Sequence, residues 1–443
     1  MVPRVMQFDN IDSVYSYFLW LLDKAPVQFG AFGLERVKFL ASLLGNPQDT
    51  YPVIHIAGTS GKWSTAYMTS RILQAHGLQV WLHVSPHLLD WRERVQVHNA
   101  FVSDAIIFTA AEKLVDAVEQ CRTSQYGNPS YYEVMMVFAY LCFALVKVDV
   151  AVIEVWCGGT YDGSNIVSRQ DKISVITRQG YDHQDLLGDT LEDIASNDVG
   201  IILPGSRVVA LHQHEDVCNQ VIMQGAQEKG VELCWITQQD CTHVRIENGQ
   251  TVFDYIDENG EIQKDIHLAL VWLFQAENAA LAISVSQLFL DNFDRAKARD
   301  GLLQSWFVWR CDVRDIGWRT IVLDGAHNPQ KMQALVDTLR VLYPGKNVVR
   351  YTAFKQWKDR EEMLGIMSDL SQKFVLWSFA GAQDMSFHNV DIEQVTNYLS
   401  TASVEECLDP TEFFRAMEKY VGEDEVVVIT GSLYWLSRVY KHL

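Results

Sequence analysis

The sequence predicts an α/β protein whose large first domain holds a parallel sheet and whose second domain is a smaller α/β unit. Three observations predict this class. Apolar, β-branched runs alternate with stretches of helical periodicity, which is the order of βαβ units. A glycine-rich turn follows one of these runs and opens a helical pattern. The chain has 443 residues, which is more than one hydrophobic core supports.

The elements of the first domain follow in order. Residues 11–45 have helical periodicity, and the polar segment 45–52 separates them from an apolar strand, "VIHIA", at 53–57. Further strands are predicted at 148–156, 172–177 and 206–211, with helices at 131–147 and 190–198. Residues 240–265 alternate apolar and polar residues around two Asn-Gly pairs, which predicts β-hairpins appended to this domain.

The second domain is predicted after the helix 276–290, because residues 292–306 turn polar there. Its strand and helix patterns lie at 319–329, 330–343, 347–354, 373–380 and 425–443. We therefore divide the chain into residues 1–295 and 296–443.

Charge and composition exclude several classes of partner. The formal net charge of -20 argues against nucleic acid and anionic membranes, because both carry the same sign. The eight cysteines show no CxxC pair, so neither a zinc site nor a disulfide framework is predicted. The N-terminus lacks a signal-peptide pattern, and the longest apolar run is too short to span a bilayer. These features predict a cytoplasmic protein.

The turn "GTSGK" is the first candidate site. Gly58 and Gly61 allow backbone amides to approach a phosphate closely, and the following helix directs the positive end of its dipole at that anion. Lys62 is then expected to neutralise the terminal phosphates. Because Ile56 stands where the full GxxxxGK[ST] pattern has its first glycine, a plain glycine turn with a surface lysine stays open.

Acidic and imidazole side chains end two of the predicted strands. Glu154 ends one apolar strand, and Asp182 and His183 follow another. Open α/β sheets bind ligands at the carboxyl ends of their strands, and a carboxylate in an apolar strand is costly unless it is paired or binds a cation. Two strands that end in this way favour a metal site over a core hydrogen bond.

Two other segments gather polar residues. The segment "VSPHLLDWRERVQV" taken alone describes a solvated loop, with Ser85, His87, Asp90, Arg92 and Arg94. In "VLDGAHNPQKM", Asp324, His327 and Asn328 follow a strand at the start of a helix. A helix cap explains Asn328 but not the other two residues.

In their order along the chain, these motifs resemble the Mur ligase superfamily, and within it folylpolyglutamate synthase and dihydrofolate synthase. The resemblance extends from about residue 34 to the C-terminus, and its motifs are "LGNPQ", "HIAGTSGKWST", "VSPHLLDWRERVQV", "VDVAVIEVWCGGTYDGSN", "ITRQGYDHQDLLGDTLEDIA", "GIILPG", "QAENAALA", "DGAHNP" and "ITGSLY". The resemblance implies a Mur-ligase-like α/β fold with a P-loop central domain and a smaller Rossmann-like C-terminal domain. Residues 1–295 are then an ATP-binding ligase domain, and residues 296–443 a glutamate-ligase domain.

The resemblance also implies a reaction. ATP phosphorylates a pterin-linked carboxylate, and the amine of L-glutamate displaces phosphate from the resulting acyl phosphate. Dihydropteroate or a reduced folate is the acceptor. Positive charge and Mg²⁺ stabilise the phosphoryl oxygens, and closure of the two domains excludes water. The family is mostly monomeric, so a monomer is expected.

Site residues are carried over by position as what the resemblance implies. The residues expected to hold ATP are Gly58, Thr59, Ser60, Gly61, Lys62, Ser64, Thr65, Asn278, Arg310, Asp324 and His327. Mg²⁺ is expected at Ser85, Glu154 and His183, and the pterin at Pro86, His87, Asp90, Arg92 and Arg94. The expected catalytic residues are Lys62, His183 and Asp198.

The sequence departs from this family at several of these positions. Trp63 replaces a glycine or threonine, and its ring either crowds the phosphates or packs away from them. Asp198 replaces a lysine that is carbamylated in relatives and helps to bind metal, so its carboxylate sits on a shorter arm. Further departures are found at Trp156, Cys157, Arg178 and Phe274 and in the approach to Arg310.

Three functions follow from these observations. The first is an ATP-dependent ligase of the folate type with adapted metal binding. The second is a catalytically impaired relative that binds nucleotide or pterin. The third is a Mur-type ligase for another carboxylate, which the segment "SPHLLDWRERVQV" disfavours because cell-wall ligases do not usually carry it.

Overall fold

The computed structural model describes residues 8–22, 29–87, 89–97, 100–306, 311–317, 319–353, 360–368, 370, 373–377, 403–407, 421–422 and 424–441. The chain divides into two compact units. The first unit comprises Met1–Thr242, Asp254–Ile266 and Glu277–Gln304. The second unit comprises His243–Phe253, His267–Ala276 and Ser305–Leu443.

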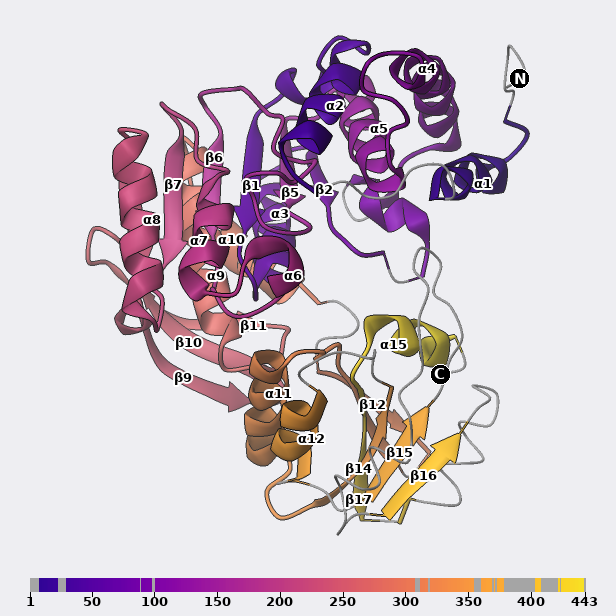
Figure 1. The fold of residues 1–443 in the computed structure, drawn as a ribbon. Coiled ribbons are helices and arrows are strands. Elements are labelled where there is room, and N and C mark those ends of the chain that lie inside the picture. The colour runs from indigo at the N-terminus through magenta and orange to yellow at the C-terminus, as the bar shows by residue number, and fades with distance from the viewer. Residues whose placement is uncertain are drawn as a thin grey trace. The chain divides into compact units, whose positions relative to one another are not determined.

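An eight-stranded sheet forms the centre of the first unit, with strand order β4-β3-β2-β5-β1-β6-β7-β8 (Figure 1). Its strands are β1 (Val53–Ala57), β2 (Val80–His83), β3 (Gln96–Val97), β4 (Ala100–Phe101), β5 (Val150–Glu154), β6 (Ile173–Ile176), β7 (Arg207–Leu211) and β8 (Leu233–Ile236). The six neighbouring strands β2-β5-β1-β6-β7-β8 pair in parallel, which confirms the predicted parallel sheet. The short antiparallel strands β3 and β4 extend one edge.

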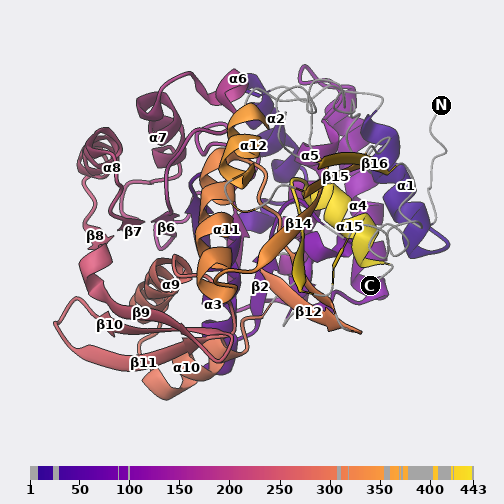
Figure 2. The same ribbon diagram turned by 90° about the horizontal axis from the view of Figure 1, so that it is seen from below.

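Helices cover both faces of this sheet. One face packs against α2 (Ala31–Ser42), α5 (Tyr131–Val146), α7 (Leu191–Val199) and α8 (Asp216–Glu228). Figure 2 shows α7 and α8 on that face, and α3 (Lys62–Ala75), α9 (Gln275–Phe289) and α10 (Arg295–Leu303) on the other. The remaining helices of the unit are α1 (Ile11–Leu22), α4 (Asp104–Arg122), α6 (Gln184–Leu187) and the 3₁₀ turns η1 (Pro47–Asp49), η2 (Trp91–Arg94) and η3 (Gln238–Asp240).

The sequence of α5 is apolar on almost every side of the helix because the helix is buried. The core of the first unit surrounds it, since α1, α2 and α4 all pack against it. Such a helix has no solvated face, so a polar stripe is absent. Ser130 and Glu133 form a capping box at its start. Glu133 also accepts two hydrogen bonds from the buried guanidinium of Arg36, at 2.8 and 2.9 Å, which neutralises its charge.

In the sequence, the residues of a separate three-stranded sheet lie between the main segments of the two units. Its strands β9 (Cys241–Glu247), β10 (Gln250–Ile256) and β11 (Ile262–Leu268) run side by side as a curved ribbon (Figure 2). Asn248 and Gly249, with φ of 50° and 73°, provide the left-handed turn that Asn-Gly pairs favour. The predicted strands are therefore present, but their residues belong to both units rather than to the first alone.

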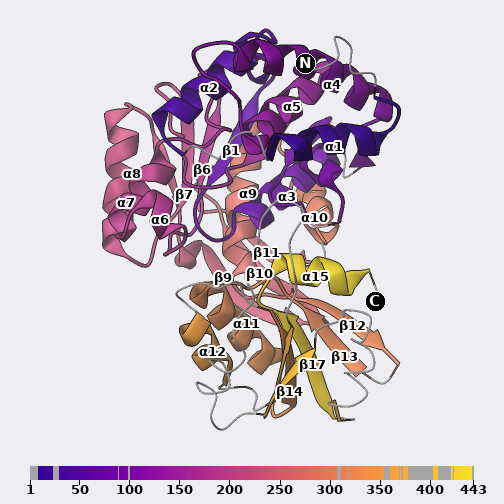
Figure 3. The same cartoon turned by 45° about the vertical axis from the view of Figure 1, so that its right-hand side comes forward.

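The second unit is built on a six-stranded sheet with the order β12-β13-β17-β14-β15-β16 (Figure 3). Its strands are β12 (Asp312–Ile316), β13 (Arg319–Leu323), β14 (Asn347–Thr352), β15 (Lys373–Trp377), β16 (Ser403–Cys407) and β17 (Glu425–Thr430), and all but β12 pair in parallel. Apolar residues of α11 (Pro329–Leu342) and α12 (Arg360–Ser368) pack against one face of this sheet. The helix α15 (Leu433–Tyr440) follows β17.

In the part of the chain that the structure describes, no helix has both the length and the apolar character needed to cross a membrane.

Candidate active site

The loop that the sequence predicts to bind phosphate joins β1 to α3. Lys62 is the first residue of α3, and Gly61 precedes it as the N-cap with φ of 94°. The Lys62 ammonium donates a hydrogen bond to the Gly58 carbonyl. Because the first backbone amides of a helix have no partner within the helix, the start of α3 offers several N–H donors and one ammonium to an anion.

Two positions of this loop must be glycine, because neighbouring side chains leave no room for a Cβ atom. A Cβ atom on Gly58 would lie 2.1 Å from the hydroxyl of Thr177, and one on Gly61 would lie 2.5 Å from Asn278 Oδ1. Asn278, on α9, is therefore packed against the loop. Ser64 and Thr65, on the first turn of α3, are both buried.

The backbone after β6 holds the first half of the loop. The amides of Thr59 and Ser60 both donate to the Arg178 carbonyl at 3.0 Å. The Thr59 hydroxyl donates to the Gly180 carbonyl at 2.9 Å and accepts from the Gly180 amide at 3.1 Å. The expected ATP-binding residues Thr59 and Ser60 thus shape the loop through contacts with the next strand.

Trp63 packs along its own helix. Its ring stacks on Tyr67, one helical turn further along α3, with ring centroids 5.3 Å apart and planes 6° apart.

Ser85 and Glu154, two of the three expected magnesium ligands, lie together at the carboxyl ends of β2 and β5. The Ser85 amide donates to Glu154 Oε2 at 3.0 Å, and both residues are buried. The Ser85 hydroxyl oxygen is buried without a hydrogen-bond partner among the described residues. An unpartnered hydroxyl beside a carboxylate suits a hard cation, so the two residues fit Mg²⁺.

His183, the third expected ligand, follows β6 and has a left-handed backbone with φ of 49°. Its Nε2 atom lies 4.0 Å from Asp182 Oδ1, and its ring centroid lies 6.2 Å from that of Trp156. Among the described residues, no group of three or more His, Cys, Asp or Glu side chains could hold a metal. A magnesium ion here would therefore rely on water and phosphate oxygens for its remaining ligands.

Asp198 is buried on α7 next to the phosphate loop, with only 2% of its surface exposed. Burial raises the pKa of its carboxyl group to about 6, while nearby Lys62 and the backbone of Gly58 act in the opposite direction. Asp198 thus contributes a carboxylate near the lysine that is expected to bind phosphate.

A second glycine-rich loop follows Glu154 and packs against the end of α7. A Cβ atom on Gly159 would lie 2.7 Å from the carbonyl oxygens of both Asn197 and Asp198. Buried Asp162 holds the loop by accepting hydrogen bonds from the Cys157 amide at 3.1 Å and the Ser164 amide at 2.9 Å. This close approach places the loop between Glu154 and Asp198.

A buried polar chain extends from this loop to β1, and the sequence reasoning missed it. Lys172 Nζ lies 3.4 Å from His55 Nδ1, His55 Nε2 lies 2.8 Å from the Ser164 hydroxyl, and that hydroxyl donates to Asp162. Burial lowers the pKa of both His55 and Lys172. A neutral His55 that accepts from Lys172 and donates to Ser164 satisfies every contact.

Several side chains of the expected pterin-binding segment contact one another, and Tyr15 and Phe18 of α1 pack against its Trp91. Asp90 caps η2 and pairs with Arg92 at 2.6 Å. Buried Arg94 donates to His87 Nδ1 at 2.9 Å. Pro86 follows Ser85 through a cis peptide bond. The five residues therefore lie in one segment, and the Asp90, Arg92, Arg94 and His87 side chains form pairs within it.

Asp324 and His327 lie in the second unit between β13 and α11. Asp324 is fully buried, and its carboxylate accepts from the amides of Cys311 at 3.0 Å and Ala326 at 2.7 Å. His327 Nε2 lies 3.2 Å from Lys331 Nζ. Asn328 caps α11 by accepting from the Lys331 amide. Arg310, also expected to hold ATP, lies outside the described residues.

Known proteins resemble this chain in sequence over most of its length. Residues 309–433 match the family model described as Mur ligase, glutamate ligase domain. A dihydrofolate synthase/folylpolyglutamate synthase of Bacillus subtilis is 30% identical over 429 residues, which cover 93% of this chain and 95% of that protein. A folylpolyglutamate synthase of Lacticaseibacillus casei is 32% identical over 315 residues, 70% of this chain and 72% of that protein.

Solved structures resemble the whole chain. The folylpolyglutamate synthase of Mycobacterium tuberculosis, in complexes with ADP and AMPPCP, matches with a TM-score of 0.85 and 25% identity, and covers 98% of this chain and 99% of that chain. A structure described as an FPGS-AMPPCP-folate complex matches with a TM-score of 0.82 and 27% identity, and covers 97% and 99%. From its sequence and its fold, this chain belongs to the dihydrofolate synthase/folylpolyglutamate synthase family of Mur ligases.

Proposed function

We propose that this protein is an ATP-dependent ligase that joins L-glutamate to a pterin-linked carboxylate through an acyl phosphate. The acceptor is dihydropteroate, a reduced folate or both. The family membership supports the reaction class, and two similar structures described as complexes with AMPPCP, one of them also with folate, support the two kinds of ligand.

The observation that carries this proposal is the geometry of the phosphate loop. Lys62 stands at the start of α3, the glycines at 58 and 61 leave no room for a side chain, and Asn278 closes one side. In this arrangement Lys62 and the backbone amides at the start of α3 would stabilise negative charge on the transferring phosphoryl group. Asp198 would hold the Lys62 ammonium in place through opposite charge.

We expect Mg²⁺ to bind at Ser85 and Glu154, with His183 as a third ligand. The unpartnered Ser85 hydroxyl beside the Glu154 carboxylate supports the first two assignments. When bound, the cation would supply positive charge to the phosphoryl oxygens. The hydrogen bonds of Asp162 would keep the loop after Glu154 in place, so that the Glu154 carboxylate stays aligned.

Residues 1–295 are proposed to bind ATP, and residues 296–443 to form the glutamate-ligase domain, where Arg310, Asp324 and His327 would contribute to the nucleotide site. The pterin is proposed to bind near residues 86–94. A monomeric state and a cytoplasmic location remain predictions from the sequence.

The impaired relative and the working ligase are separated by turnover. The test is phosphate release from ATP with Mg²⁺ and L-glutamate, with and without a pterin acceptor, for the natural protein and for Lys62→Ala. We expect release that requires both substrates and is abolished in the variant, whose fold should persist. A Lys62→Ala protein with unchanged turnover would refute the assignment of the loop.

A further inference from the structure

We propose that Arg178 is a positioning residue of the nucleotide site, because its ion pair with Glu277 holds the phosphate loop in place against α9. We call this ion pair the brace. The inference rests on the proposed function, in which this loop binds ATP.

The backbone of Arg178 is already part of the loop's support. Its carbonyl oxygen accepts hydrogen bonds from the amides of Thr59 and Ser60, both at 3.0 Å. A movement of Arg178 therefore moves the first half of the loop, since both amides would lose their acceptor or follow it.

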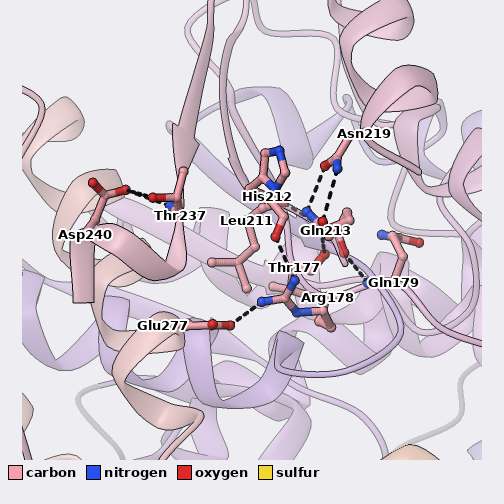
Figure 4. Close-up of polar contacts among 10 residues, drawn as sticks. All are labelled: Thr177, Arg178, Gln179, Leu211, His212, Gln213, Asn219, Thr237, Asp240 and Glu277. Atoms are coloured by element: carbon pink, nitrogen blue, oxygen red, sulfur yellow. Dashed lines mark hydrogen bonds and ion pairs between the residues drawn. The ribbon is translucent and has the colours of Figure 1, made fainter. Parts of the chain in front are cut away.

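The side chain of Arg178 points to a different element. Its guanidinium forms an ion pair with Glu277 and donates to the His212 carbonyl at 2.7 Å, as Figure 4 shows. The two charged side chains are only 11% and 16% exposed, so solvent screens this pair less than a surface pair. Glu277 lies in the first turn of α9, where a negative charge is also favoured by the helix dipole.

The residue after Glu277 is Asn278, which reaches the other half of the loop. Its Oδ1 atom lies so close to Gly61 that a Cβ atom there would be 2.5 Å away. One turn of α9 therefore contacts the loop twice, directly through Asn278 and indirectly through Glu277 and Arg178. Together the two contacts fix the distance between the start of the loop and the start of α3.

The residues on both sides of Arg178 are anchored separately. Gln213 accepts from the Gln179 amide at 2.8 Å and donates to the Thr177 carbonyl at 3.1 Å, and Asn219 accepts from the Gln213 amide at 2.8 Å (Figure 4). Loss of the Arg178 side chain should therefore leave β6 and its neighbours folded. Its effect should fall on the contact between the loop and α9.

The test compares Arg178→Met, Glu277→Gln, the double variant and a control, Arg207→Met. The Arg207 side chain also donates to a carbonyl oxygen of α9, that of Leu288. Leu288 lies at the opposite end of this helix from Glu277. Affinity for AMPPCP with Mg²⁺ is measured by calorimetry, thermal midpoints report folding, and steady-state rates separate KM from kcat. Glu277→Gln keeps the shape of the side chain and serves if Arg178→Met does not fold.

We expect each single variant to bind AMPPCP about tenfold more weakly, which corresponds to about 1.4 kcal/mol. The double variant should be no weaker than the singles, because both remove the same ion pair. The KM for ATP should rise while kcat and the KM for glutamate stay nearly unchanged, and Arg207→Met should bind normally.

Unchanged affinity in folded Arg178→Met and Glu277→Gln, beside a natural protein that binds AMPPCP, would overturn the brace alone. A natural protein that binds no AMPPCP would overturn both the brace and the proposed nucleotide site. A loss of affinity in Arg207→Met equal to that in the other variants would also overturn the brace, since it would show a general effect of α9.

Discussion

The buried chain that supports the loop after Glu154 leads to a quantitative prediction about Lys172. This side chain is fully buried, and its ammonium is 3.4 Å from His55 Nδ1. Burial lowers the pKa of Lys172 from 10.5 to about 7. The unfolded chain, with the lysine in water, therefore binds more protons than the folded chain between these two values, and stability should rise with pH across that range.

The size of the effect follows from the two pKa values. At about 1.4 kcal/mol per pH unit, the buried ammonium costs about 4 kcal/mol of folding free energy at pH 7 and about 2 kcal/mol at pH 9. Lys172→Met removes this cost but also a hydrogen bond to His55 worth about 1 kcal/mol at either pH. The variant should thus be more stable than the natural protein at pH 7, and its advantage should shrink by about 2 kcal/mol at pH 9.

The assay is urea unfolding of both proteins at pH 7 and pH 9, followed by tryptophan fluorescence. Comparing the variant with the natural protein cancels the other groups that titrate in this range. A difference in unfolding free energy that is the same at both pH values would refute the reasoning, because the lysine would then keep its ordinary pKa in the folded state.

Three further predictions concern the phosphate loop and its neighbours. Gly61→Ala should lose AMPPCP binding, because its Cβ would meet Asn278 Oδ1 at 2.5 Å. The control is Gly77→Ala, which has a similar φ of 92° and open space around it and should lower stability without affecting binding. Equal binding of AMPPCP by both variants in calorimetry would contradict this prediction. Trp63→Ala should lose the stacking on Tyr67, worth about 1 kcal/mol, and keep its KM for ATP; a large rise in KM would show that the ring contacts the nucleotide. Asp198→Lys should lose turnover and stability, because it would bury a second ammonium beside Lys62; faster phosphate release would instead identify Asp198 as a defect.

The sequence predicted the parts of the fold that rest on strong local patterns. The β-branched runs at β5, β6 and β7 and the glycine turn before α3 were found because burial on both faces of a parallel strand leaves a continuous apolar run. The strands β3 and β4 were missed because each has only two residues, which is too short for a period to be visible.

The candidate site divides in a similar way. The positions of Lys62 and Glu154 follow from patterns at strand ends, whereas Ser85 was assigned only through the family resemblance. The pairing of Arg178 with Glu277 joins residues 99 positions apart, and no local pattern encodes it. Lys172 precedes β6 and resembles a solvated strand end, so only the structure reveals that its side chain is buried. The direction of the Trp63 ring was likewise undetermined until its neighbour Tyr67 was placed.

The most direct test of the central claim is mass spectrometry of the pterin after incubation with ATP, Mg²⁺ and L-glutamate. Dihydropteroate and tetrahydrofolate should be supplied in separate reactions, with omission of ATP as the control. We predict that at least one of them gains the mass of a glutamyl residue, and only when ATP is present. An unmodified pterin in both reactions, from a protein that binds AMPPCP normally, would contradict the account and identify a nucleotide-binding relative without ligase activity.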